Sequence, residues 1–227
     1  MTSEGSWVHL LPLESPRLIL RRFASVDVQP FLAYRSDPAV ARFQGWESIS
    51  LAEATAFVAR QEAQPIGEPG QWLQIAITLK GGGKLIGDCA LRVHAPDARQ
   101  AIIGITLSSL FQGQGYGQEA LSALLDSVFA RMRLHRVQAD TDPHNTPAWK
   151  LLERLGMRRE VHSRQSLWFK GRWADEYVYG ILRSEWLERR PFSVYPSIRI
   201  SKNERGSWMC KVALKINKAG MDGKKVS

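Results

Sequence analysis

The stretch Phe111-Gln112-Gly113-Gln114-Gly115-Tyr116-Gly117, which runs into a helical pattern ending near Arg133, decides the fold of this chain. Its three glycines stand at alternate positions and can adopt backbone angles that other residues avoid, so neighbouring N–H groups can point to one place. The apolar residues that follow have the spacing of a helix buried on one face. Such a loop typically binds a phosphate or diphosphate, because free N–H groups and the helix dipole both attract an anion.

Four interpretations of this loop compete. A nucleotide P-loop needs Lys-Ser or Lys-Thr after its glycines, and neither follows here. The dinucleotide fingerprint is matched formally by Gly115, Gly117 and Ala120, but it normally opens a long alternating chain, whereas this loop follows several strands. The pattern Q/R-x-x-G-x-G/A, met by Gln112, Gly115 and Gly117, resembles the acyl-CoA diphosphate loop of the GNAT superfamily of N-acetyltransferases. The last interpretation is a glycine-rich turn without a ligand.

Length and composition predict an ordinary globular protein. The 227 residues suit one domain with an appendage, and the hydrophobic content of 44% is normal for a packed core. No secretory signal and no apolar run long enough for a membrane helix is seen, which predicts a soluble, cytoplasmic protein with no membrane partner. Two cysteines and five histidines without ligand spacing predict no metal site.

The net charge of +9 is concentrated at the C-terminus. After residue 190 eight Lys and Arg residues stand against two carboxylates, a balance of +6 that leaves +3 for residues 1–190. A mildly basic body argues against nucleic acid as a partner. We expect two regions: a domain over residues 1–190 and a basic extension over residues 191–227 that is solvated and partly disordered.

Hydrophobic patterns predict a mixed sheet around the loop. Alternating segments before the loop form a meander, and a closing hairpin follows it; the predicted strands are 17–23, 72–78, 84–93, 100–107, 135–140, 159–169 and 173–182. Ser50 and Glu53 form a capping box for one helix, and Pro147 and Gly156 bracket another. Because the loop helix joins strands 100–107 and 135–140, we expect these two strands to be parallel.

Five motifs in order resemble the GNAT N-acetyltransferases, specifically the branch that includes the RimJ and RimL ribosomal-protein alanine acetyltransferases. They are Arg17-Leu18-Ile19-Leu20-Arg21, Lys84-Leu85-Ile86-Gly87, the glycine loop, Asp142 to Ala148 with the helix that ends in Leu155-Gly156-Met157, and Gly171 to Tyr177. The resemblance covers roughly residues 15–186. It implies an α/β (α+β) GNAT fold: a mixed sheet of six to seven strands with about four helices, splayed between the strands that end near Leu107 and Asp140.

The resemblance also implies a reaction and a site. Acetyl-CoA would donate an acetyl group to a primary amine, either a protein N-terminus or a small molecule, by direct transfer. Family positions map acetyl-CoA binding onto Ile105, Leu107, Gln112, Gly113, Gln114, Gly115, Tyr116, Gly117 and Asn145. The main-chain N–H of Leu107 would stabilise the oxyanion. For Asn145, a helix N-cap is an equally weighted role.

The chain departs from the family where side chains handle protons. Ile102 stands where many members of the branch have a glutamate, Ala148 replaces a serine, and Leu152 replaces a tyrosine. Glu160 matches a glutamate given a base role in some members, although a surface carboxylate is the alternative. These losses keep a second hypothesis open, a CoA-binding regulatory module without turnover.

Other candidates near the expected site are polar or aromatic. His144 could titrate near neutrality, and turn formation before Pro143 is the simpler role for Asp140 and Asp142. Phe43, Trp46 and Trp168 could bind the acceptor, and core packing is their alternative. Related enzymes imply a monomer or a homodimer.

Overall fold

The computed structural model describes residues 10–189, 197–202 and 208–213. The chain divides into two compact units, residues 1–189 and residues 190–227. Most of the expected basic extension lies outside the described residues.

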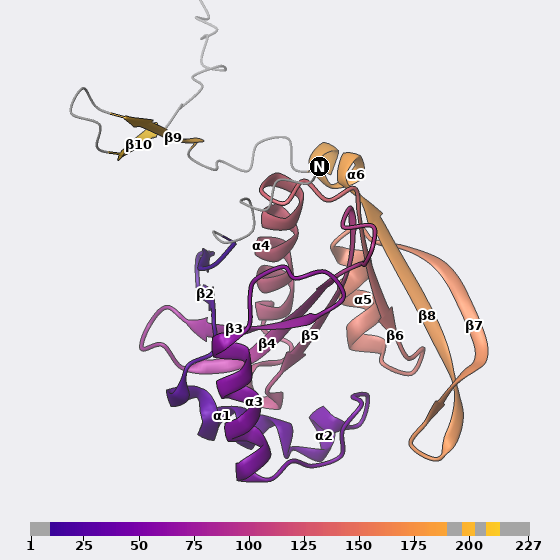
Figure 1. Cartoon of the computed structure of the whole chain (residues 1–227). Coiled ribbons are helices and arrows are strands. Elements are labelled where there is room, and N and C mark those ends of the chain that lie inside the picture. The colour runs from indigo at the N-terminus through magenta and orange to yellow at the C-terminus, as the bar shows by residue number, and fades with distance from the viewer. Residues whose placement is uncertain (1–9, 190–196, 203–207, 214–227) are drawn as a thin grey trace, which may run out of the picture. The chain divides into compact units, whose positions relative to one another are not determined.

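One eight-stranded mixed sheet forms the centre of the first unit (Figure 1). The strands follow the order β1-β2-β3-β4-β5-β6-β8-β7. Their bounds are β1 Leu13–Glu14, β2 Leu18–Arg21, β3 Trp72–Leu79, β4 Leu85–Val93, β5 Gln100–Leu107, β6 Arg136–Thr141, β7 Arg158–Phe169 and β8 Arg172–Leu182. The predicted mixed sheet is confirmed, with one strand more than expected. The extra strand is β1, whose two residues pair with Ile19 and Leu20 and are too short to show an alternating pattern.

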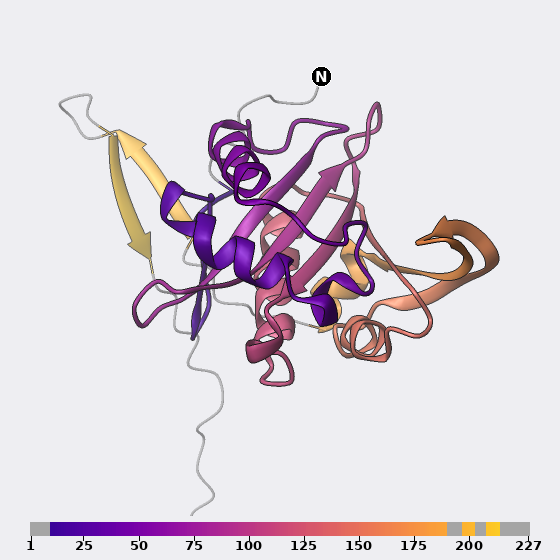
Figure 2. The same cartoon turned by 90° about the horizontal axis from the view of Figure 1, so that it is seen from below.

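Helices cover both faces of this sheet (Figures 1 and 2). Their bounds are α1 Val28–Arg35, α2 Pro38–Ala41, α3 Leu51–Ala63, α4 Tyr116–Ala130, α5 Thr146–Arg154 and α6 Arg183–Arg189. Apolar residues of α4 and α5 pack with the strands into the larger core. A smaller core, with Phe23, Phe31 and Val58, packs α1 and α3 on the opposite face. The predicted capping box is confirmed, since Ser50 Oγ accepts from Glu53 N–H and the Glu53 carboxylate accepts from Ser50 N–H.

Strands β5 and β6 are parallel, as predicted, but they stay together only briefly. Their pairing runs from Gln100↔Arg136 to Ile102↔Gln138 and ends there. β5 continues to Leu107, whereas β6 pairs with β8 along its length, from Arg136↔Leu182 to Thr141↔Tyr177. The sheet therefore splits between the C-terminal ends of β5 and β6.

The β7–β8 hairpin closes the sheet and reaches back across it. The sequence predicts the hairpin turn over Lys170, Gly171 and Arg172, but Arg172 already pairs with Phe169, so the turn has two residues. Lys170 and Gly171 both have positive φ, 48° and 79°, as a type I′ turn requires. The Lys170 ammonium donates hydrogen bonds to the carbonyls of Ala41 and Trp46, each at 2.8 Å. The hairpin tip is thereby tied to α2 and to the loop that follows it.

The described part of the second unit is a two-stranded antiparallel ladder. Strands β9 (Ser197–Lys202) and β10 (Trp208–Ala213) pair from Ser197↔Ala213 to Lys202↔Trp208. In neither unit does the described chain contain a helix that combines the length and the apolar character needed to cross a membrane.

Candidate active site

The free edge of β5 faces the split in the sheet. Ser108 N–H donates to the Ile86 carbonyl and His94 N–H donates to the Gln100 carbonyl, each at 2.9 Å, so even-numbered residues of β5 bond to β4. In an antiparallel ladder the odd-numbered residues then turn their main-chain groups to the other side. Because β6 has already diverged there, the N–H groups of Ile105 and Leu107 face the split.

The glycine loop after β5 gathers further N–H groups. Gly113 and Gly115 have φ values of 74° and 82°, in the region that favours glycine, and Gly115 is the N-cap of α4. Within the described chain no hydrogen bond takes up the N–H groups of Gly113, Gln114 or Gly115, and the first helical bond runs from Glu119 N–H to the Gly115 carbonyl at 3.1 Å. The N–H groups of the first helical turn are also free, because no helical carbonyl lies four residues before them to accept their hydrogen bonds. Together with the positive end of the helix dipole, they favour an anion.

Arg17, about a hundred residues earlier in the chain, contacts this loop and the first turn of α4. Its Nε donates to Glu119 Oε2 at 2.6 Å and its Nη1 donates to the Gln114 carbonyl at 3.1 Å. Its guanidinium also lies over the Tyr116 ring, 4.2 Å from the centroid. Sequence reasoning assigned Arg17 only to a strand motif, because nothing local links it to a loop about a hundred residues away.

Two side chains of the loop turn inward. Gln112 Nε2 donates to the Leu107 carbonyl at 2.9 Å, and Gln114 Nε2 donates to the Leu110 carbonyl at 2.8 Å. Both amides hold the shape of the loop. We therefore expect these two residues to contact an anion through their main-chain N–H groups and not through their side chains.

A hollow of about 160 Å³ lies in the split beside the loop helix. Its lining includes Ile105 from β5, Asn145 and Ala148 from the start of α5, and Leu151 and Leu152. Asn145 occupies the N-cap position of α5 but its side chain makes no capping hydrogen bond. That side chain is consequently left for a ligand in the hollow. Gly117 borders the same region, since a Cβ placed there would come within 3.2 Å of Leu151.

A second hollow of about 250 Å³ opens on the α1 side of the sheet. Its lining residues are Arg35, Gln44, Trp46, Trp72, Gln74, Asp88, Ala90, Arg92, Ile102, Ile103, Gly104, Ile105, Thr106 and Asp140. Ile103, Gly104, Ile105, Gln44 and Asp140 border both hollows. The two hollows therefore meet at the split, where β5 is without a partner strand.

A buried ion pair forms one wall of the second hollow. Arg35 Nη2 lies 3.1 Å from Asp88 Oδ2, and the Tyr34 hydroxyl donates to Asp88 Oδ1 at 2.5 Å. The Arg35 guanidinium stacks on Trp46, 3.6 Å from the ring centroid. Burial, and then the charge of Asp88, raises the pKa of Tyr34 well above its ordinary value. This network holds Trp46 in place, and the Trp46 Nε1–H also donates to the Arg35 carbonyl at 3.1 Å.

Comparison with known proteins identifies the family. The acetyltransferase (GNAT) domain matches residues 17–158, more than half of the chain. The chain belongs to the GNAT acetyltransferase family. It is 29% identical over 174 residues to the uncharacterized N-acetyltransferase YnaD of Bacillus subtilis, covering 77% of this chain and 98% of that protein.

Two further relatives agree with this family. A crystal structure of a GNAT acetyltransferase from Bacillus anthracis has a TM-score of 0.69 and 27% identity, covering 77% of this chain and all of that one. The ribosomal protein uS5-alanine N-acetyltransferase of Escherichia coli is 30% identical over 88 residues, 39% of this chain and 45% of that enzyme. The expected branch is thus represented among the relatives. The chain is an N-acetyltransferase that uses acetyl-CoA as co-substrate, not a binding module alone.

The acetyltransferase places its candidate base, Glu160, away from both hollows. Arg136 Nη1 donates to Glu160 Oε1 at 2.7 Å, and a second contact joins Arg136 Nη2 to Glu160 Oε2. Arg136 lowers the pKa of Glu160 below its ordinary value, first through these hydrogen bonds. A carboxylate held ionised in this way is a weak proton acceptor, and the geometry favours the surface role.

The aromatic candidates separate into two groups. Phe43 borders the smaller hollow and Trp46 the larger one. Trp168 borders neither, is 60% exposed on the β7–β8 hairpin, and packs edge-on against Trp173 with centroids 5.4 Å apart. The pattern of apolar and polar residues along β7 could not show that Trp168 is exposed, because β7 is the last strand of the sheet and exposes most of its residues on both faces.

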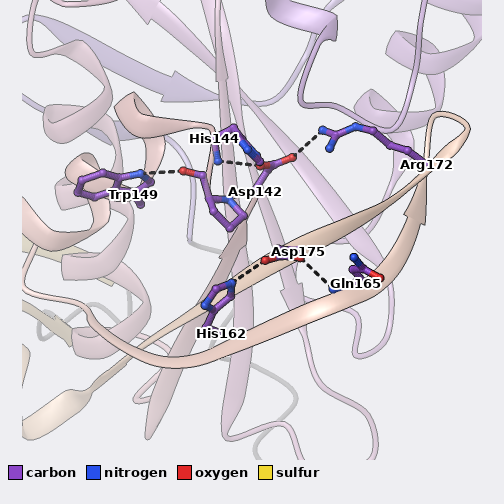
Figure 3. Close-up of polar contacts among 8 residues, drawn as sticks. Asp142, His144, Trp149, His162, Gln165, Arg172 and Asp175 are labelled. Carbon is purple, nitrogen blue, oxygen red and sulfur yellow. Dashed lines mark hydrogen bonds and ion pairs between the residues drawn. The ribbon is translucent and has the colours of Figure 1, made fainter.

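His144 and Asp142 form a turn at the end of β6 (Figure 3). Asp142 Oδ1 accepts from His144 N–H at 2.7 Å and contacts His144 Nδ1 at 2.8 Å, and Arg172 reaches Asp142 Oδ2 at 3.4 Å. The suggested turn role fits Asp142. Figure 3 also shows His162 paired with Asp175 within the hairpin, at 2.8 Å. Among the described residues, no group of three or more His, Cys, Asp or Glu side chains could hold a metal ion.

Substitution of Gly115 by alanine is expected to weaken acetyl-CoA binding about five- to thirty-fold. An alanine held at a φ of 82° costs about 1–2 kcal/mol, and relaxing the loop would turn its N–H groups apart. Calorimetry with acetyl-CoA measures the dissociation constant. Gly82→Ala is the matched control, because Gly82 also has a positive φ, 101°, but lies in the β3–β4 turn with no atom within 4 Å of an added Cβ. Equal affinity losses in both variants would contradict the role of the loop.

Proposed function

We propose that acetyl-CoA lies in the split, with its diphosphate at the glycine loop and its acetyl group at the junction of the two hollows. The observation that supports this most is the unpaired edge of β5, which leads from that junction to the free amides at residues 113–117. The pantetheine amides can then pair with the main chain of Leu107, which lies between the loop and the junction, as an added strand would. Asn145 provides a further polar contact, and apolar residues of α5 cover the carrier.

The acceptor amine enters through the second hollow in this proposal. The lone pair of the neutral amine attacks the thioester carbonyl carbon. The N–H of Ile105, which borders both hollows, stabilises the oxyanion that forms, in place of the Leu107 N–H expected from the sequence. As the new C–N bond forms, the C–S bond breaks and CoA leaves as a thiolate. The amide nitrogen loses one proton and the thiolate takes one up. Trp46 and Phe43 shape the approach of the acceptor, which is a primary amine of a protein N-terminus or a small molecule.

An amine-panel assay tests the proposal. Thiol release from acetyl-CoA is followed with peptides, amino acids, polyamines and aminoglycosides, while calorimetry with acetyl-CoA and with NAD tests the carrier. We expect acetyl-CoA to bind, NAD not to bind, and at least one amine to be acetylated. The proposal places the enzyme in the cytoplasm, where a free, buried Cys89 stays reduced. Light scattering would then distinguish a monomer from a homodimer.

Glu160→Gln is expected to change kcat by less than about twofold. The variant loses the ion pair with Arg136, whose contribution is below about 1 kcal/mol because the Glu160 side chain is 40% exposed. Since the pKa of Glu160 is lowered on folding, this contribution is present above about pH 4.3 and is lost as the pH falls below it. Rates and urea unfolding between pH 3 and pH 7 measure both effects. A large loss of kcat with normal stability would restore Glu160 as the base.

A further inference from the structure

The second hollow contains one cation and one anion that no ion pair neutralises within the described chain. Arg35 and Asp88 neutralise each other at one wall. The guanidinium of Arg92 lies 4.6 Å from the centroid of the Trp72 ring and has no carboxylate partner among the described ion pairs. Asp140 accepts one hydrogen bond, from Gln138 Nε2 at 2.9 Å, and has no cationic partner in the same part of the chain. These two charges are available to a ligand.

The sheet places Arg92 and Asp140 on the same face. On β4 the neighbours Cys89 and Leu91 point into the larger core, so Arg92 points to the opposite face. On β6, Ala139 points into that core, and Asp140 accordingly shares the face of Arg92. Both residues border the second hollow, and Asp140 also borders the split where the acetyl group is placed.

Small residues separate the two charges. Ala90 and Gly104 are paired on β4 and β5 and form the floor between Arg92 and Asp140. A Cβ added at Gly104 would meet only the Ala90 Cβ, at 3.6 Å. Two strand spacings place the Cα atoms of the two charged residues at least about 10 Å apart, and the divergence of β6 from β5 adds to this distance. The length of the arginine side chain shortens the gap between the charged ends. A small molecule fits over this floor with one end at each charge.

We propose that the acceptor is a small zwitterion whose primary amine binds at Asp140 and whose acidic group, a carboxylate or phosphonate, binds at Arg92. This inference rests on the proposed function and adds the substrate class to it. Arg92 provides the planar guanidinium that pairs well with such an acid, and its stacking on Trp72 holds it in place. Asp140 holds the ammonium beside the split, where it loses one proton to water before the neutral amine attacks the thioester.

The remaining charges around Asp140 favour an ammonium there. Glu176 of β8 lies on the same face, since Asp140 pairs with Val178 two residues away. Burial, and then the charge of Asp140, raises the pKa of Glu176 above its ordinary value, which means that the two carboxyl groups sense each other. A diamine bound at this end would bring its second ammonium toward Arg92 and be repelled, so polyamines are disfavoured.

The test uses matched acceptors on the intact enzyme. Thiol release is measured with α- and ω-amino acids, their methyl esters, the amines that lack the carboxyl group, an aminoalkyl phosphonate and spermidine. A charge-assisted pair with Arg92 should give the acid a kcat/KM at least about ten-fold above its ester. Arg92→Gln should abolish this preference mainly through KM, and Arg92→Lys should restore part of it. Arg99→Gln, which removes a surface cation next to Asp97, should leave the preference intact.

Asp140→Asn completes the design. It should lower kcat/KM for every amine while the dissociation constant of acetyl-CoA stays the same, and Glu62→Gln is the control for losing a surface carboxylate. A wild-type preference for esters or spermidine, or an Arg92→Gln variant with unchanged selectivity, would overturn the inference and leave the acetyltransferase assignment standing. Acetyl-CoA binding without turnover of any amine would instead contradict the proposed function itself.

Discussion

Ile105→Pro is expected to lower kcat about 100- to 1,000-fold while acetyl-CoA still binds. The substitution removes one main-chain N–H, the group proposed to face the oxyanion, and a lost donor of this kind has an effect of that size. The N–H of Ile105 lies on the free edge of β5 and points away from β4, so proline removes no ladder hydrogen bond. Single-turnover rates with a saturating amine, and calorimetry with acetyl-CoA, measure the two quantities separately.

Ile105→Ala is the matched variant for this test. It removes the same apolar side chain, which packs against the larger core, but keeps the N–H. We expect Ile105→Ala to lose some stability and to keep kcat within about ten-fold of the wild type. The difference between the two variants isolates the N–H. If both had the same kcat, the oxyanion would have to be stabilised elsewhere.

Local sequence signals predicted the loop and the helix that we propose hold the diphosphate of acetyl-CoA. The glycine spacing and apolar stripe identified the loop and α4, and two of the three glycines, Gly113 and Gly115, have positive φ. The crossover between two apolar strands predicted that β5 and β6 are parallel, which the pairing of Gln100 with Arg136 confirms. These features depend on neighbours within a few residues, and the pattern of the chain encodes them directly.

The acceptor side depends on contacts between distant parts of the chain. Arg35 with Asp88, and Arg17 with Glu119, are ion pairs across 53 and 102 residues, and no spacing rule predicts such partners. Asp140 and Asp142 look alike in the sequence, yet only Asp142 forms a turn, with His144, while Asp140 borders both hollows. Their different roles follow from the split in the sheet, which appears only when β6 pairs with β8.

Apolar residues occupy three positions where relatives of this family have acid or base side chains. Ile102, Ala148 and Leu152 all border the hollows, and none can transfer a proton. In the proposed mechanism, catalysis rests mainly on placement and on main-chain N–H groups, which work at any pH where the amine is neutral. An acceptor held between two fixed charges suits this strategy, because its orientation replaces part of what a general base would contribute.

Asp88→Ala is expected to lower the free energy of unfolding by about 3–5 kcal/mol. It leaves the Arg35 guanidinium buried without its carboxylate, and removing one partner of a buried ion pair usually has an effect of this size. The Tyr34 hydroxyl loses its acceptor at the same time. Urea unfolding at neutral pH measures the loss, and circular dichroism confirms that the variant is folded before unfolding.

The double variant Arg35→Met with Asp88→Ala distinguishes an unpaired charge from a simple loss of packing. Removing both charges eliminates the desolvated guanidinium, and replacement of a buried pair by apolar residues is often close to neutral. We therefore expect the double variant to be more stable than Asp88→Ala alone, although it lacks one more native side chain. The single variant Arg35→Met completes the comparison. If the stability loss of the double variant equalled the sum of the losses in Asp88→Ala and Arg35→Met, Arg35 would act by packing on Trp46, and the ion pair itself would contribute little.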